Sequence, residues 1–164
     1  MIMEKKILDY LQLSDEVEED GREAQRLELE EEFSREGRSF YEVLSLRGIR
    51  VNRVDPGFIS CSFKVPLRLT DRDRNLANGA IVNLVDEVGG ALVQIQGLPP
   101  CVSVDMSIAF LSTAKLGEEL EVTSRLLGER GRYKGTLVVV RNKRTGEVIA
   151  EGRHSLFGRQ ASKL

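Results

Sequence analysis

Residues 75–105 read NLANGAIVNLVDEVGGALVQIQGLPPCVSVD, and this stretch decides the fold. Apolar residues recur within it at i, i+3, i+4 and i+7, which is the spacing of one stripe along an α-helix. The members of this stripe are Ile81, Leu84, Val85, Val88, Ala91, Leu92 and Ile95. We expect a helix from about Ala77 to Gln96, because a glycine and a proline pair follow and end it.

A carboxylate lies within this apolar helix. At about 100° per residue, Asp86 falls well off the stripe, with Gly89 and Gly90 among its angular neighbours. Glu87 falls on the side that we expect to be solvated. Burying a carboxylate is costly unless it is paired or hydrogen-bonded. Asp86 is therefore either a general base or nucleophile, or a structural cap or ion-pair partner, and the pattern leaves both interpretations open.

Length, composition and charge predict one domain that follows an acidic leader. The chain has 164 residues, 41% of them hydrophobic, without the run of about 18 apolar residues that a membrane span needs. Residues 1–36 carry a net charge of −8, and the remainder carries +6. We expect residues 1–37 to form a helix-prone leader, solvated or loosely docked, before a domain at 38–158.

Six strand-like segments flank the helix in the sequence. Two precede it, at 51–54 and 58–65, and are joined by an Asp-Pro-Gly turn. Four follow it, at Cys101–Ser112, Glu118–Leu127, Tyr133–Arg141 and Val148–Phe157. Hairpins after one central helix predict an α+β fold, in which an antiparallel sheet packs on that helix. Regular alternation in the strand from Cys101 would place Ser103 and Met106 on opposite faces.

The remaining composition excludes several classes of function. Basic residues are dispersed without interleaved aromatics, which argues against nucleic acid and suits an anionic small molecule, with Arg132 and Lys134 as candidate contacts. No Gly-x-Ser-x-Gly elbow of a serine hydrolase occurs. Cys61 and Cys101 are expected to be buried free thiols without a zinc ligand set. His154, the only histidine, lies in the last strand, where we expect a structural role.

Four motifs occur in a characteristic order. Asn-Gly-Ala opens the helix at 78–80 and is followed by Leu-Val-Asp, then Val-Ser-Val-Asp-Met at 102–106, Ala-Lys-Leu-Gly-Glu at 114–118, and an ending Gly-x-x-Ile-Ala-Glu-Gly-Arg-His at 146–154. The chain thereby resembles the hotdog-fold acyl-CoA thioesterases, of the phenylacetate-pathway and mammalian thioesterase superfamily member type, from about residue 40 to residue 157. The resemblance implies a sheet wrapped around the helix, and homodimers that pair edge to edge and often form tetramers. It also implies hydrolysis of an acyl-CoA without metal or redox cofactor.

The resemblance also implies site residues. Asp86 matches the helix carboxylate, which acts as base or nucleophile from the facing subunit. Gly79 matches the glycine whose backbone N–H, at the helix start, stabilises the oxyanion. Ser103 matches the serine on the following strand that positions water or substrate.

Two departures from the family pattern qualify this expectation. The common His-Gly-Gly at the helix start is Ala-Asn-Gly here, and the loop asparagine that contacts water is Asp71, which cannot donate as an amide does. Asn75 and Asn78 are candidates to replace the missing polar contacts. The alternative interpretation is therefore a hotdog dimer that binds an acyl-CoA for regulation without turning it over.

The last residues, 159–164, form a predicted targeting tail. They end in Ser162-Lys163-Leu164, and a C-terminal Ser-Lys-Leu is the address that the peroxisomal import receptor reads. Peroxisomes suit acyl-CoA chemistry and lipid metabolism. We expect a peroxisomal, plant-like member of the family.

Overall fold

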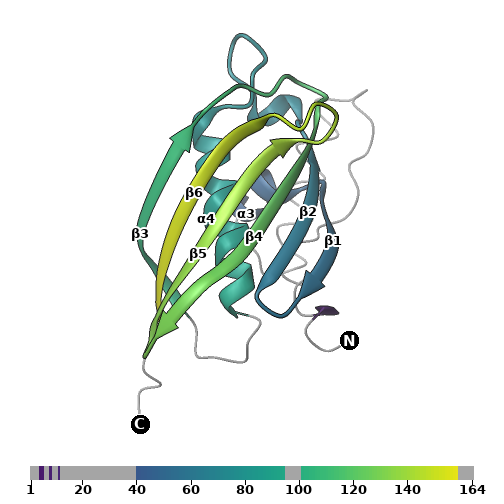
Figure 1. Ribbon diagram of the computed structural model, residues 1–164. Helices are drawn as coiled ribbons and strands as arrows, with labels where there is room; N and C mark the ends of the chain where they lie inside the picture. The colour runs from purple at the N-terminus through teal and green to yellow at the C-terminus, as the bar shows by residue number, and fades with distance from the viewer. Residues whose placement is uncertain (1–3, 6–7, 9–10, 12–39, 95–100, 159–164) are drawn as a thin grey trace.

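The computed structural model describes residues 4, 5, 8, 11, 40–94 and 101–158. The elements of the continuous segments, labelled in Figure 1, are α3 (Phe40–Leu46), β1 (Ile49–Asp55), β2 (Phe58–Lys64), the 3₁₀ turn η1 (Leu67–Leu69), α4 (Asn78–Gln94), β3 (Cys101–Phe110), β4 (Glu119–Arg130), β5 (Tyr133–Asn142) and β6 (Val148–Gly158). No helix in this described part of the chain is long and apolar enough to span a bilayer.

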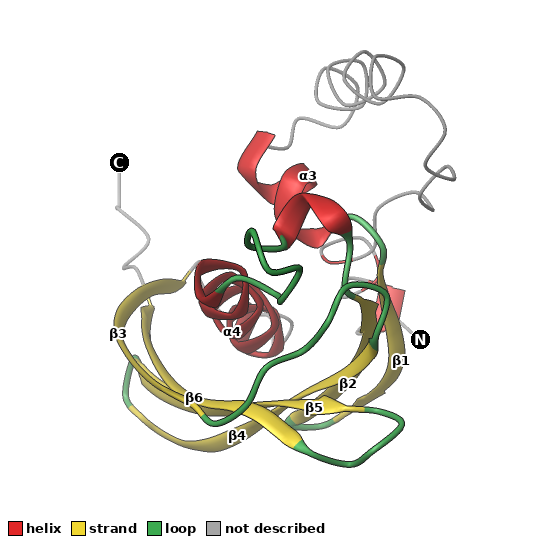
Figure 2. Ribbon diagram, turned by 90° about the horizontal axis from the view of Figure 1, so that it is seen from above, coloured by secondary structure: helices red, strands yellow, loops and turns green. Residues whose placement is uncertain are grey.

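The six strands form one sheet in the order β1-β2-β4-β5-β6-β3. Every neighbouring pair is antiparallel. The pairs β1–β2, β4–β5 and β5–β6 are hairpins, whereas the chain crosses the sheet from β2 to the far edge at β3, and from β3 back to β4. The sheet curves around α4, which lies along its concave face (Figure 2). The predicted fold, an antiparallel sheet wrapped around one long helix, is confirmed.

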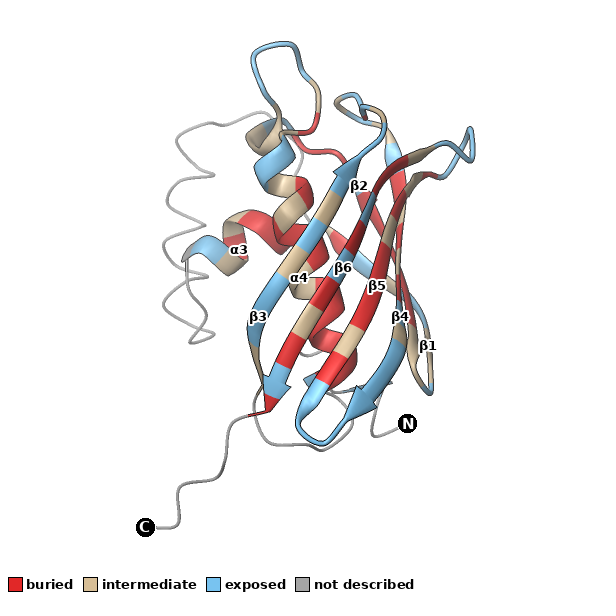
Figure 3. Ribbon diagram, turned by 60° about the vertical axis from the view of Figure 1, so that its left-hand side comes forward, coloured by how far each residue is buried: buried red, intermediate tan, exposed pale blue. Residues whose placement is uncertain are grey.

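Helix α4 supplies a large apolar surface that packs against the sheet. Ten of its residues are buried, namely Ile81, Asn83, Leu84, Val85, Val88, Gly89, Gly90, Ala91, Leu92 and Val93. Each fully buried aliphatic side chain contributes roughly 1.5–3 kcal/mol to folding. Buried residues accordingly follow α4, and they alternate with more exposed ones along β5 and β6 (Figure 3).

Two elements outside the predicted set complete the core. Helix α3 packs against α4. The Arg68 side chain donates from Nε to Leu44 O in α3, at 2.7 Å, and from Nη2 to the carbonyl of Arg47, just after α3, at 2.5 Å. Leu11, in the leader, is fully buried in the hydrophobic core. The expectation left the leader either solvated or loosely docked, and at Leu11 it is docked; residues 1–3, 6–7, 9–10 and 12–39 lie outside the described part.

Both cysteines are free thiols, as predicted. Cys61 is buried, and burial raises the pKa of its thiol to about 12. Cys101 is half-buried at the start of β3.

Candidate active site

Asp86, Ser103 and His154 meet where α4 faces the edge of the sheet. The Ser103 hydroxyl donates to Asp86 Oδ1 at 2.7 Å, and His154 Nε2 lies 2.9 Å from Ser103 Oγ. His154 Nε2 is also 3.3 Å from Asp86 Oδ1. The structure therefore brings the two predicted polar residues together and adds the histidine.

The Asp86 and His154 side chains differ sharply in solvent accessibility. The Asp86 side chain is 39% exposed, whereas that of His154 is 0% exposed. Of the two Asp86 oxygens, Oδ1 holds both contacts, and Oδ2 has no hydrogen-bond partner among the described residues. Oδ1 is thus fixed by Ser103 and His154, while Oδ2 is left for water or a substrate.

A β-bulge in β3 turns Ser103 toward the helix. Ser103 pairs with Leu156 and Asp105 with Ser155, so Val104 is an extra residue in the ladder. Ser103 therefore shares the inner face with Met106, which packs against the core. The expectation from regular alternation, which placed Ser103 and Met106 on opposite faces, is wrong for this reason.

The hydrogen-bond network fixes the tautomer of His154. Because the Ser103 hydroxyl donates to Asp86, its oxygen is left to accept from His154 Nε2–H. His154 Nδ1 is then the bare acceptor, and it is buried without a partner. Burial lowers the pKa of His154 below its ordinary value. The negative charge of Asp86 acts in the opposite direction and raises the pKa, but by less. With its pKa lowered from 6.5, His154 is mainly neutral at pH 7, and its proton is on Nε2.

The alternation of residues in the last strand could have indicated from the sequence that His154 points inward and needs a partner. The buried residues in the second half of β6 alternate with exposed or half-buried ones, so Gly152, His154 and Leu156 share the face that packs on α4. A polar residue on that inward face needs a partner there. The partner, Ser103, comes from the neighbouring strand.

The start of α4 offers a backbone donor. The Ala77 carbonyl accepts from both Ala80 N, at 2.9 Å, and Ile81 N, at 3.2 Å. The Gly79 N–H has no acceptor in the described part of the chain. A Cβ added at Gly79 would meet nothing within 4 Å, so the space beside this residue is open.

The loop before α4 is held by Asp71. Its Oδ1 accepts from the backbone N–H groups of Asp73 and Asn75, both at 2.9 Å. The bond from the Asn75 N–H is the main reason that the pKa of Asp71 lies below its usual value. Asn75 Oδ1 is buried without a partner, and Asn78 is exposed as the first residue of α4. Contact of these three residues with substrate stays a prediction.

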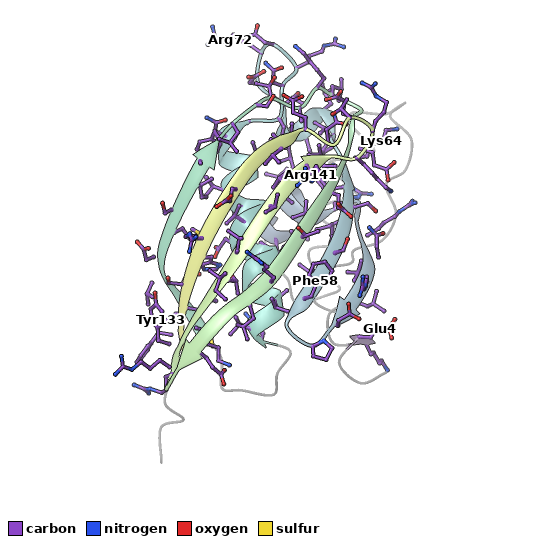
Figure 4. All side chains as sticks on the ribbon, viewed as in Figure 1. Glu4, Phe58, Lys64, Arg72, Tyr133 and Arg141 are labelled. Atoms are coloured by element: carbon purple, nitrogen blue, oxygen red, sulfur yellow. The ribbon has the colours of Figure 1, made fainter. Side chains whose placement is uncertain are left out.

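The two predicted basic contacts occupy the other end of the sheet. Tyr133, labelled in Figure 4, marks this end, and Arg72 marks the loop before α4. Arg132 is exposed and stacks over the Phe157 ring, with 4.5 Å from its guanidinium carbon to the ring centroid. Lys134 is only 3% exposed and forms an ion pair with Glu129 at 2.9 Å. Of the two, only Arg132 presents its charge to solvent.

Comparison with known proteins places this arrangement in a family. The model of the thioesterase superfamily matches residues 74–149. Human acyl-coenzyme A thioesterase 13 is 39% identical over 101 residues, which cover 61% of this chain and 72% of the human protein. This chain belongs to the thioesterase superfamily.

Solved structures of superfamily members share the fold. Zebrafish thioesterase superfamily member 2 matches with a TM-score of 0.68 and 31% identity, over 72% of this chain and 86% of that one. The mouse thioesterase superfamily member 2 matches with a TM-score of 0.66 and 30% identity, over 82% of this chain and 94% of that one. As a member of the thioesterase superfamily, the chain is a thioester hydrolase.

Proposed function

We propose that this thioesterase hydrolyses an acyl-CoA to the free acid and CoA, with Asp86 as general base or nucleophile. The observation that carries the proposal is the state of the Asp86 carboxylate, with Oδ1 held by Ser103 and Oδ2 open to a half-exposed surface. A carboxylate fixed through one oxygen presents the other in a defined direction. The names of the curated relatives supply the substrate class.

In the general-base form, Asp86 Oδ2 removes a proton from water as the water oxygen bonds to the thioester carbonyl carbon. The carbonyl oxygen becomes an oxyanion, for which the Gly79 N–H and the positive end of α4 are suited. Collapse of this intermediate breaks the C–S bond, and the departing CoA thiolate takes up the proton from Asp86. In the nucleophilic form, Asp86 attacks the carbonyl carbon itself, and the C–S bond breaks with release of the CoA thiolate. Water then hydrolyses the resulting anhydride to the free acid and the Asp86 carboxylate.

The proposed site draws on two subunits. Gly79 and Asp86 of one chain are separated by seven residues of helix, about 10 Å of rise, which is long for two groups that must act on one carbonyl. Asp86 and Ser103 also lie beside β3, an unpaired sheet edge. We therefore propose a dimer in which Gly79 of one chain faces Asp86 of the other.

The two edges of the sheet differ in a way that supports this pairing. Along and just beyond β3, Val104 is 53%, Phe110 43% and Leu111 62% exposed. Figure 3 shows this edge as the most exposed strand on that side of the sheet. The opposite edge, β1, exposes Arg50 and Arg53 instead. Charged side chains protect an edge from pairing, whereas exposed apolar ones invite it.

A free-thiol assay on a panel of short, long and aromatic acyl-CoA thioesters tests the proposal. Asp86→Asn keeps the shape of the side chain and removes its charge, so we expect the turnover number to fall about 10²-fold or more. Glu87→Gln, one residue along the same helix, is the matched control and should change turnover little. Binding of acyl-CoA without any turnover by the wild type would instead establish the regulatory alternative.

A further inference from the structure

Helix α4 approaches β6 too closely for side chains at two positions. A Cβ added at Gly152, in β6, would lie 2.6 and 3.0 Å from the two γ carbons of Val85. A Cβ added at Gly89, in α4, would lie 2.8 Å from His154 Nδ1 and 3.0 Å from Thr136 Oγ1. Such separations are well inside van der Waals contact, so a methyl group at either position must displace its neighbours.

In one of the two contacts a helix side chain packs on a strand glycine, and in the other a strand side chain packs on a helix glycine. Val85 and Gly89 are four residues apart and share one face of α4, while Gly152 and His154 are two apart and share one face of β6. The helix thus inserts Val85 over the gap at Gly152, and the strand inserts His154 into the gap at Gly89. Sliding or rotating the helix on β6 would move Val85 away from Gly152 and Gly89 away from His154.

Conformational freedom does not explain these glycines. The glycines with positive φ are Gly48, Gly57, Gly117, Gly128, Gly131 and Gly146 among the described residues, and neither Gly89 nor Gly152 is one of them. Glycine inside a helix costs roughly 1 kcal/mol of stability relative to alanine. The reason for a glycine at position 89 is therefore the space that it leaves for the His154 ring.

The two contacts act directly on the candidate site. Asp86 follows Val85 in the sequence, and His154 is the residue that fills the gap at Gly89. Val85 cannot yield easily, since a β-branched side chain in a helix has one strongly preferred rotamer. The His154 ring is buried and cannot swing outward without losing its contact to Ser103.

We propose that Gly89 and Gly152 are positioning residues, which set the register of α4 on β6 and so hold Asp86 within hydrogen-bonding reach of Ser103 and His154. This inference rests on the proposed role of Asp86 in turnover. A displacement of about 1 Å at a reacting group can cost about 10²-fold in rate. The expected signature is a loss of turnover number without a matching loss of substrate binding.

Gly90 provides a matched control in the same helix. A Cβ at Gly90 would meet only Leu156 Cδ2, at 3.9 Å, which is ordinary contact. Gly90→Ala and Gly89→Ala make the same chemical change at adjacent positions. Helix propensity rises equally in both, so a difference between them reports the close contacts at Gly89, of which the shortest is with His154.

The kinetic experiment compares four variants of the full chain with the wild type. For Gly89→Ala and Gly152→Ala we expect kcat to fall about tenfold or more, with KM changed less than about threefold. Gly90→Ala should stay within about twofold of the wild type in both constants. Gly152→Ala combined with Val85→Ala removes both clashing γ carbons, and should recover most of the lost kcat. If Gly89→Ala does not fold, this double variant and Gly152→Ala still decide the question.

A second readout follows register without requiring turnover. The chain has one histidine, so the imidazole signal of His154 in an NMR pH titration is unambiguous. In Gly89→Ala the ring is displaced, so the pKa of His154 should lie closer to its ordinary value than in the wild type. In Gly90→Ala the pKa of His154 should equal that of the wild type. Unchanged kcat and titration in Gly89→Ala, or an equal loss in Gly90→Ala, would overturn the inference. A wild type without turnover would sink the proposed function, and the titration would still decide the register.

Discussion

His154 Nε2 lies 2.9 Å from Ser103 Oγ, although 51 positions separate the two residues in the sequence. The contact determines where the serine proton points. With the neutral imidazole donating to its oxygen, the Ser103 hydroxyl is directed at Asp86 Oδ1. A buried side chain thereby orients a half-exposed carboxylate through one intervening hydroxyl.

The first prediction concerns stability as a function of pH. The folded protein holds the pKa of His154 below its ordinary value of 6.5, so the unfolded chain binds the proton more readily. The resulting stability is fully present above pH 6.5 and is lost as the pH falls through the folded pKa. Urea unfolding of the wild type between pH 8 and pH 5 should show this loss.

The control for this pH effect is His154→Gln, which keeps a polar side chain but does not titrate. Its unfolding free energy should fall less steeply between pH 7 and pH 5 than that of the wild type. Equal slopes for the two proteins would mean that His154 is not held neutral in the fold.

The second prediction concerns the leader. Leu11 is fully buried, and truncating a buried leucine to alanine typically costs about 2–5 kcal/mol. We expect Leu11→Ala to lower the free energy of unfolding, measured in urea, by an amount in this range. Lys5→Ala, at an exposed position of the same leader, should change it by less than about 0.5 kcal/mol. A silent Leu11→Ala would show that the leader leaves the core in solution.

The sequence predicted the elements whose signal is local. The stripe along α4 and the alternation in the hairpins are periodic within one segment, and they located that helix and the six strands to within a few residues. Asp86 and Ser103 were found because each stands in a motif. The contact between these residues was not derivable, because it depends on the bulge at Val104, which regular alternation does not reveal.

The features that the sequence did not predict are contacts between distant segments. His154 was assigned a structural role because its partner is on another strand. For the leader, the sequence left a solvated and a loosely docked arrangement open, because a short apolar stripe around Leu11 does not say what it packs against. The close approach of α4 to β6 depends on the absence of a side chain at Gly89, which a pattern of apolar residues does not register.

The third prediction concerns location in the cell. We propose that a chain ending in Ser162-Lys163-Leu164 is imported into peroxisomes through that tripeptide. A fluorescent protein fused to the N-terminus should be peroxisomal with the full chain and cytosolic when the three residues are deleted. Purified protein lacking them should keep its thioesterase activity, because β6 ends at Gly158, before the tail. Peroxisomal signal from the deletion would refute the assignment.

The last prediction asks whether one site needs two chains. Asp86→Asn removes the proposed base, and Gly79→Val fills the open space beside the proposed oxyanion donor, so each variant alone should be nearly inactive. In a symmetric dimer formed from an equal mixture, about half of the molecules are heterodimers. If Gly79 of one chain faces Asp86 of the other, each heterodimer has one site with both defects and one with neither. Refolding the two variants together should then restore about a quarter of the wild-type activity, whereas mixing them after folding should restore less at first.

If each site is built within a single chain, no heterodimer contains an intact site and activity stays at the level of the variants. A strictly monomeric mass by light scattering at micromolar concentration, with full activity in the wild type, would contradict the shared site directly.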